Sequence, residues 1–316
     1  MSVLVTGGAG FIGSNLVRAL VEEGYSVRVL DNFFSGFPEN LEEVKSKVEI
    51  IKGDIRDSDS VRKAVQGMEY VFHEAAQVFV GLSIQKPEET NEINVSGTLN
   101  LLIASRDAGV KKVLFASSSS VYGNVPEKEL PIQESRKPNP ESPYALTKLI
   151  GEWYLEVFRK VYGMRYLGFR YFNVYGPRQN PESEYAAVVP KFIKRVLQGR
   201  PPVIYGDGYQ SRDFVFIDDV VRANILGMEK NTTGVFNLGS GRDVTINELA
   251  EKICKLAGKE LKPVYQDQRP GDVKYSLGDI SLIKEKLGFR PEINLDEGLR
   301  KTIEWFKFKN KQIKVC

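Results

Sequence analysis

Residues 2–14 read SVLVTGGAGFIGS, and this stretch decides the fold. A short β-branched run passes into a glycine-rich turn, and an amphipathic segment over Ile12–Glu23 follows directly. Gly7, Gly10 and Gly13 recur at every third position. Such a turn is tight, and glycines let its backbone approach a pyrophosphate at the N-terminus of the following helix. The stretch therefore predicts a strand, a phosphate-binding turn and a helix.

Four further apolar runs follow in the first half of the chain, with helical segments such as Asn91–Asp107 between them. These runs cover Val27–Leu30, Val48–Ile51, Tyr70–Phe72 and Val113–Phe115. Short apolar runs that alternate with helices are typical of a parallel sheet covered on both faces. We predict an α/β fold with a doubly wound parallel sheet of the Rossmann type.

The composition of the chain changes near residue 175, where the predicted elements become shorter. Before this point, Ser142 and Pro143 open a helix that runs to about Tyr162. We place a dinucleotide-binding domain at residues 1–175 and a smaller α/β substrate-binding domain at residues 176–316, with one or two elements returning to the first domain. The predicted elements of the second domain are a helix near Ala186–Gln198, strands around Val203 and Phe214, and helices opened by Asp218 and by Thr245 with Glu248.

The composition also excludes several classes of protein. The 44 lysines and arginines against 41 acids give a net charge of +3, which indicates no nucleic-acid partner. No apolar run approaches the ~18 residues of a membrane span, and the start does not resemble a signal peptide. Cys254 and Cys316 cannot form a disulfide framework, and the single histidine leaves no metal-ligand cluster. We expect a cytoplasmic protein with no metal and no membrane partner.

Asp31 ends the second predicted strand, downstream of the glycine turn. A carboxylate at this place accepts hydrogen bonds from the ribose hydroxyls of an adenosine and repels the 2′-phosphate of NADP. Asp31-Asn32 is also typical of a turn, so a purely structural role for Asp31 stays open. The glycine turn and this acid together predict NAD as the cofactor.

Tyr144 and Lys148 lie four residues apart on one predicted helix and therefore share a face. A nearby ammonium stabilises a phenolate and lowers the pKa of the tyrosine, which makes it a usable base. The fifth strand runs into a row of serines at residues 117–120, at the edge where doubly wound sheets bind ligands. The Tyr144–Lys148 pair could instead be an ordinary pair on a helix surface, and the row of serines could be a plain polar loop. Tyr122 is a competing base, although no lysine follows four residues later.

Further motifs follow in order along nearly the whole chain. They are Gly53-Asp54-Ile55-Arg56-Asp57, His73-Glu74-Ala75-Ala76, Asn94-x-x-Gly97-Thr98, SSSSVYG at 117–123, Arg170-Tyr171-Phe172-Asn173-Val174-Tyr175-Gly176, Arg212-Asp213-Phe214 and Arg269-Pro270-Gly271-Asp272. With the glycine turn and the Tyr–Lys pair, they resemble the extended short-chain dehydrogenase/reductase family, and within it the NAD-dependent nucleotide-sugar epimerases.

The resemblance implies roles for individual residues. Ser118, Tyr144 and Lys148 would be catalytic, with Tyr144 as the acid/base. NAD would be held by Gly7, Gly10, Phe11, Ile12, Gly13, Asp31, Asn32, Ser35, Gly36, Asp54, Ile55, Ala75, Ala76, Gln77, Asn94, Ser117, Tyr144, Lys148 and Tyr171. A UDP-sugar would be held by Ser118, Tyr144, Asn173, Val188, Tyr205, Arg212, Arg269, Asp272 and Ser276. His73 ends a strand and is expected to be structural.

The activity implied by the resemblance is that of a UDP-hexose 4-epimerase, which interconverts gluco and galacto sugars through a 4-keto intermediate. The small side chain of Ser276 would admit an N-acetyl group. Alternatives are a UDP-glucuronate epimerase or decarboxylase, a 4,6-dehydratase, which would need two carboxylates at Ser119-Ser120, and a dinucleotide-sensing regulator without activity. The family also predicts a homodimer through a bundle of Asn91–Asp107 and Tyr144–Tyr162.

Overall fold

The computed structural model describes residues 1–181, 187–268 and 273–313. Its largest element is a seven-stranded sheet of order β10-β6-β5-β4-β1-β2-β3, in which all neighbouring strands are parallel. The strands are β1 (Ser2–Thr6), β2 (Ser26–Asp31), β3 (Val48–Lys52), β4 (Tyr70–His73), β5 (Lys112–Ser118), β6 (Arg165–Tyr171) and β10 (Gly234–Leu238). The predicted doubly wound parallel sheet is therefore confirmed.

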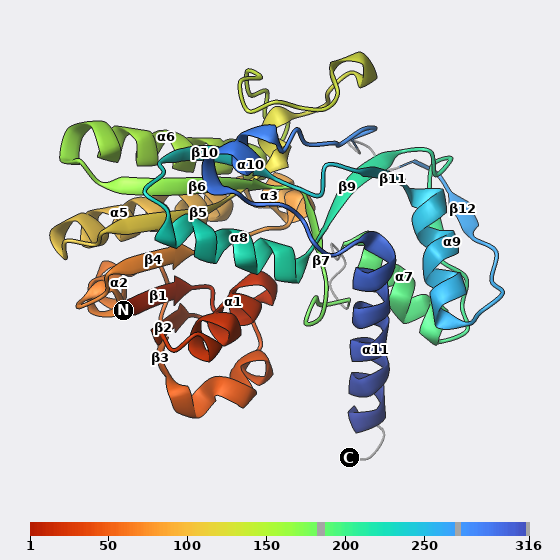
Figure 1. Ribbon diagram of the computed structural model, residues 1–316, viewed down its shortest axis with the longest axis horizontal. Coiled ribbons are helices and arrows are strands. Elements are labelled where there is room, and N and C mark those ends of the chain that lie inside the picture. The colour runs from red at the N-terminus through yellow and green to blue at the C-terminus, as the bar shows by residue number, and fades with distance from the viewer. Residues whose placement is uncertain (182–186, 269–272, 314–316) are drawn as a thin grey trace.

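Helices cover both faces of this sheet (Figure 1). On one face α1 (Phe11–Glu22) packs against α8 (Ile217–Glu229). On the other face α5 (Gly97–Asp107) contacts both α2 (Ser58–Val65) and α6 (Pro143–Tyr162). The sheet is thus the middle layer of three.

Alternate side chains of β1 enter two different core clusters, because successive residues of a strand point to opposite faces. Val3 and Val5 belong to the cluster of Leu16 in α1, and Leu4 belongs to the cluster of Leu101 in α5. All five side chains are completely buried. Burial of one such side chain stabilises the fold by about 1.5–3 kcal/mol, so both faces hold the strand ends in place.

The sequence signals for two helix starts are confirmed. Ser142 accepts a backbone hydrogen bond in the first turn of α6, and Pro143 is the first residue of that helix. Thr245 and Glu248 form a capping box at the start of α9 (Ile246–Ala257). The cap of α6 fixes the helix that carries Tyr144.

The helix predicted over Asn91–Asp107 is present, but it contains a π-helical turn. The structure has α4 (Pro87–Asn91), then a π-helical turn over Glu92–Ser96, and only then α5. In the wider turn the side chain of Asn94 bonds to the backbone of Gln77. Turns of this kind are common near functional sites, and apolar periodicity does not reveal them.

The remaining elements gather at one side of the large sheet (Figure 1). They are α7 (Val188–Leu197), α9, α11 (Leu295–Ile313), a sheet of β7 (Asn173–Tyr175), β9 (Ser211–Phe216) and β11 (Asp243–Thr245), and the pair β8 (Val203–Tyr205) and β12 (Val264–Gln266). Between them the chain returns to the large sheet, since β10 pairs with β6. Short helices α3 (Val80–Gln85) and α10 (Ser281–Leu287) complete the fold. Within the described ranges, no helix is long and apolar enough to cross a membrane.

Candidate active site

A cleft of about 1310 Å³ lies along the carboxyl ends of the parallel strands. Asp31 at the end of β2, Ser118 at the end of β5 and Tyr171 at the end of β6 line one wall. Val188 of α7 and Tyr205 of β8 line the opposite wall. Pockets for one small ligand usually measure ~300–1,000 Å³. The cleft therefore has room for two ligands side by side.

The glycine turn forms one end of the cleft. Gly7 has a φ of 69°, in the left-handed region that favours glycine, and Gly10 caps α1. A Cβ atom on Gly13 would meet the carbonyl oxygen of Gly7 at 2.2 Å. Because no side chain fits there, the helix packs directly on the turn and leaves its first backbone N–H groups available to an anion.

Asp31 is fixed beside this turn by two backbone hydrogen bonds. Its carboxylate accepts the N–H of Ala9 at 2.9 Å and the N–H of Phe33 at 2.7 Å. Burial raises the pKa of Asp31, and these two bonds act in the opposite direction. Each carboxylate oxygen accepts more than one hydrogen bond, so Asp31 retains acceptor capacity toward the cleft.

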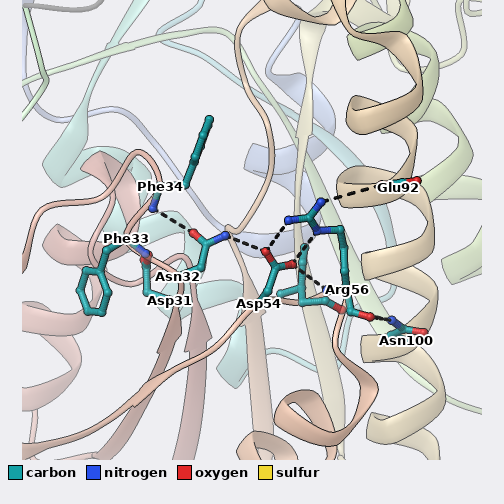
Figure 2. A network of polar contacts seen from close by, with 9 residues as sticks. Asp31, Asn32, Phe33, Phe34, Asp54, Arg56, Glu92 and Asn100 are labelled. Atoms are coloured by element: carbon teal, nitrogen blue, oxygen red, sulfur yellow. Dashed lines mark hydrogen bonds and ion pairs between the residues drawn. The ribbon is translucent and has the colours of Figure 1, made fainter.

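A polar network continues from Asp31 toward α5 (Figure 2). Asn32 donates to Asp54 at 2.9 Å, and the guanidinium of Arg56 donates to the same carboxylate at 2.8 Å. The hydrogen bond from Arg56 lowers the pKa of Asp54 to about 2. Glu92 holds Arg56 from the other side, at 3.8 Å. The carboxylates of Asp31 and Asp54 therefore make this end of the cleft anionic, and the hydrogen bonds from Asn32 and Arg56 hold the Asp54 carboxylate in place.

Tyr144 and Lys148 of α6 meet Ser118 at the middle of the cleft. A hydrogen bond with Ser118 lowers the pKa of Tyr144, but burial raises it by more. Lys148 Nζ donates to the carbonyl oxygen of Ala116 at 2.7 Å and lies 5.9 Å from the centre of the Tyr144 ring. Burial also lowers the pKa of Lys148 to about 8. In this arrangement burial outweighs the hydrogen bond, so the pKa of Tyr144 lies above its ordinary value, and a pKa lowered by Lys148 together with the positive nicotinamide stays a prediction for the NAD-bound protein.

Tyr122 is not placed to act as the base. Its hydroxyl donates to Asn237 at 2.6 Å and receives a bond from Arg170 at 2.8 Å, and it does not line the cleft. Burial raises the pKa of Tyr122 to about 12. Arg170 also forms a buried two-point ion pair with Glu152, which accepts a bond from Ser117 at 2.5 Å. Through the bond from Ser117 to Glu152, this network holds the end of β5 in place.

Known proteins share this fold. Residues 3–239 match the NAD dependent epimerase/dehydratase family. The chain belongs to this family. A solved UDP-N-acetylglucosamine 4-epimerase from Methanobrevibacter ruminantium, in complex with UDP-N-acetylmuramic acid, is 44% identical, with a TM-score of 0.94 and 98% of each chain covered. A UDP-glucose 4-epimerase from Thermotoga maritima with UDP-glucose is 44% identical, with a TM-score of 0.94 over 98% of this chain and 100% of that one. A UDP-glucose 4-epimerase from Thermus thermophilus in complex with NAD is 40% identical, with a TM-score of 0.90 over 97% and 99%.

The cleft fits the dinucleotide that gives the family its name. The turn that excludes a Cβ at Gly13 offers backbone N–H groups to a pyrophosphate, and Asp31 offers a carboxylate to ribose hydroxyls. Most of the residues predicted to bind NAD line the cleft, namely Gly7, Gly10, Phe11, Ile12, Gly13, Asp31, Asn32, Ser35, Gly36, Asp54, Ile55, Ala75, Ala76, Gln77, Ser117, Tyr144, Lys148 and Tyr171.

Five of the residues predicted to bind substrate also line the cleft, namely Ser118, Asn173, Val188, Tyr205 and Arg212, with Tyr144 between the two sets. Arg269 and Asp272 lie outside the described residues. Asn94 and Ser276 are not brought to the cleft wall.

Each of those two residues has a structural reason for its position. The amide of Asn94 is buried, bonded to the backbone of Gln77 at 2.8 and 2.9 Å and to Thr147 at 3.0 Å. Ser276 is buried beside β9, where its carbonyl oxygen accepts the N–H of Asp213 at 2.7 Å. Asn94 thus supports a cleft residue, and the substrate contact expected of Ser276 stays a prediction.

Several residues of the cleft had no role in the sequence analysis. Glu74 and Arg178 line it, and so do Lys191, Lys194 and Arg195 of α7. The regular spacing of these basic residues on α7 was an available signal for them, since positions three and four apart share a helix face. Glu74 follows the predicted strand Tyr70–Phe72, and this position at the carboxyl edge of the sheet was a signal for it, whereas no comparable signal exists for Arg178.

His73 has the structural role expected of it. Its ring nitrogens bond to Thr6 Oγ1 at 2.8 Å and to Thr98 Oγ1 at 2.9 Å, and it is buried. Burial lowers the pKa of His73 to about 3, which keeps the ring neutral. In this member of the family His73 therefore ties β4 to β1 and α5.

Proposed function

We propose that this chain is a UDP-hexose 4-epimerase that interconverts gluco and galacto sugars with NAD bound in the cleft. The observation that carries the proposal is the meeting of Ser118, Tyr144 and Lys148 between the glycine turn and the α7 wall. Tyr144 can accept a proton at a position between the binding region for a dinucleotide at the glycine turn and the binding region for a second, anionic ligand at the α7 wall. A 4-epimerase needs this order, because one carbon of its substrate is oxidised and then reduced.

Proton transfer is the task of the chain itself. Tyr144, as phenolate, takes the proton of the sugar O4 hydroxyl and later returns it. Ser118, whose side chain lowers the pKa of Tyr144, holds the same sugar oxygen. The ammonium of Lys148 favours the phenolate over the neutral phenol. NAD, which the glycine turn and Asp31 would hold, would supply the redox chemistry as a reversible hydride acceptor at C4. The sugar passes through a 4-keto form, and no net oxidation results.

The second wall of the cleft suits a nucleoside diphosphate. Arg212 of β9 lines it together with Lys191, Lys194 and Arg195 of α7. A guanidinium pairs with phosphate oxygens through two parallel hydrogen bonds, and ammonium groups add positive charge. We assign the UDP moiety to this wall, with contacts from Asn173, Val188, Tyr205 and Arg212. The contacts expected from Arg269 and Asp272 stay predictions.

A UDP-glucuronate epimerase or decarboxylase is the second candidate. The number of basic side chains on the α7 wall favours it, because a uronate carries one carboxylate more than a hexose. The dehydratase reaction is disfavoured because Ser119 and Ser120 are hydroxyls, which cannot replace a pair of carboxylates in proton transfer. A sensor without activity would have no use for Tyr144 and Lys148.

Proton NMR of the purified protein with UDP-glucose, UDP-N-acetylglucosamine and UDP-glucuronate in turn tests the proposal. We expect inversion at C4 of UDP-glucose and of UDP-N-acetylglucosamine. Turnover of UDP-glucuronate alone would move the assignment to the second candidate. A 6-deoxy-4-keto product, or no turnover of any of the three, would contradict both.

We further propose a homodimer through α5 and α6. Leu146, Trp153, Val157 and Val161 form an apolar stripe on α6, 44%, 58%, 49% and 63% exposed, away from the face that covers the sheet. A helix bundle needs such a second stripe. Trp153→Glu should convert the dimer to a monomer in light scattering, whereas Phe308→Glu on α11, also 58% exposed, should leave the mass unchanged. A monomeric wild type would contradict this.

A cytoplasmic location is our last proposal on function. Cys254 is a buried free thiol, which suits a reducing compartment. Cell fractionation of the source organism should recover the protein with soluble cytoplasmic enzymes, and recovery from an exported fraction would contradict the proposal.

A further inference from the structure

Glu74, directly after β4, is the one carboxylate near Tyr144 and Lys148 among the described residues that line the cleft. The other two lining acids, Asp31 and Asp54, lie at the end that holds the adenosine network. Glu74 Oε1 accepts a hydrogen bond from the hydroxyl of Tyr171 at 3.0 Å. Its backbone N–H donates to the carbonyl oxygen of Thr6 at 3.2 Å, so the residue is held against the glycine turn.

The Tyr171 hydroxyl is oriented toward Glu74 by a third residue. Asn224 of α8 donates its amide N–H to that hydroxyl at 2.9 Å, so the hydroxyl proton is left for the carboxylate. Tyr171 is almost completely buried. Because the donor is held in place, the carboxylate has one defined position on the cleft wall.

The charged and titratable groups that face Glu74 are Lys148 and Tyr144 of α6 and Tyr171 of β6. Burial raises the pKa of Glu74 to about 7, and the Lys148 ammonium acts to lower it. Glu74 in turn raises the pKa of both Lys148 and Tyr144. Within the described residues, however, Glu74 forms no direct ion pair with a basic side chain. Its charge is therefore available to a cation in the cleft.

We propose that Glu74 is a charge partner of the nicotinamide, which makes the protein favour bound NAD⁺ over bound NADH. The nicotinamide must lie beside Tyr144 and Lys148, since the reacting sugar carbon is there. The ring carries a positive charge in NAD⁺ and none in NADH, so a fixed anion stabilises the oxidised form. Glu74 does not touch the substrate in this role. A preference for NAD⁺ suits an enzyme that returns each hydrogen it removes, because the reduced cofactor is then driven to give its hydride back to the sugar and little of it accumulates.

The test is the ratio of NAD⁺ to NADH that the full-length protein retains from defined mixtures, measured at pH 8 after removal of free nucleotide. No sugar is present, so the result is independent of the proposed epimerase activity. Glu74→Gln keeps an oxygen acceptor for Tyr171 and removes the charge. We expect the preference for NAD⁺ to fall about tenfold, the effect of a unit charge within ~10 Å at the effective dielectric of a protein.

Asp31→Asn is the matched control, because it removes one carboxylate from the same cleft at the other end. NAD⁺ and NADH share the adenosine half, so this variant should bind both more weakly with an unchanged ratio. A ratio within twofold of wild type in Glu74→Gln would overturn the proposal, as would an equal change of ratio in both variants, which would indicate a merely structural effect.

The wild-type protein gives a second test that does not depend on folding of a variant. With a pKa of about 7, Glu74 loses its charge as the pH falls from 7.5 to 5.5, so the preference for NAD⁺ should decrease over this range. Lys148, with a pKa of about 8, is already mostly charged at pH 7.5. Asp31→Asn should show the same decrease. A ratio that does not depend on pH in the wild type would overturn the proposal.

Discussion

The two ends of the cleft suit ligands that carry phosphate, but they do so by different means. At the first end a glycine turn presents backbone N–H groups, and the side chains around it, Asp31 and Asp54, are acids. At the second end Arg212 and the basic residues of α7 present cationic side chains. Because neutral N–H groups attract the pyrophosphate, the first end can also carry acids, and these acids repel an additional phosphate on the ribose. The second end attracts any anion of suitable shape.

Tyr144→Phe should leave both ends intact and remove only the chemistry between them. We expect turnover of the UDP-hexose to fall by ~10²–10⁴, the usual contribution of a positioned acid/base. Affinities for NAD⁺ and UDP, measured by calorimetry, should stay within about twofold.

Tyr122→Phe is the control for that variant, since Tyr122 is buried outside the cleft and hydrogen-bonded to Asn237 and Arg170. It should retain turnover within about tenfold. Equal losses in the two variants would mean that the Tyr144 hydroxyl has no special role.

Gly13→Ala should damage the first end and spare the second. Its Cβ would meet the Gly7 carbonyl at 2.2 Å, so the turn must move, at a cost of ~1–3 kcal/mol. NAD⁺ affinity should fall about tenfold to hundredfold while UDP affinity is unchanged. Gly10→Ala, whose Cβ would lie 3.2 Å from the same oxygen, should cost less. If both variants bind NAD⁺ like the wild type, the turn is not the phosphate site.

Arg212→Gln should do the reverse. One charge-assisted hydrogen bond contributes about 1.5 kcal/mol, so UDP affinity should fall about tenfold and NAD⁺ affinity should not change. Arg242→Gln, an exposed residue outside the cleft lining, removes the same charge and should affect neither ligand. A loss of NAD⁺ affinity in Arg212→Gln would show that the two ends are not separate.

The features that could be predicted from the sequence are those formed by residues close together in the chain. The glycine turn, Asp31 and the Tyr144–Lys148 pair depend on short spacings within one strand, turn or helix, so local patterns reveal them. The π-helical turn that directs the amide of Asn94 to the backbone of Gln77 has no such local pattern, and the role of Asn94 toward NAD stays a prediction.

Other features depend on contacts between distant segments. Glu74 acquires its place through Tyr171, 97 residues away in the chain. Ser276 is held beside β9 by a backbone bond to Asp213, 63 residues away in the chain. No periodicity within the sequence records such pairings.

The most direct test of the central claim follows the hydrogen at C4. The protein is incubated with UDP-glucose in D₂O, and C4 and C5 of both sugars are examined by NMR. We predict full retention of protium at both carbons in the UDP-galactose formed, because the hydrogen removed from C4 is the one returned, while only the O4 proton passes through Tyr144 and exchanges with solvent. Deuterium at C4 or C5 of the product would contradict the account.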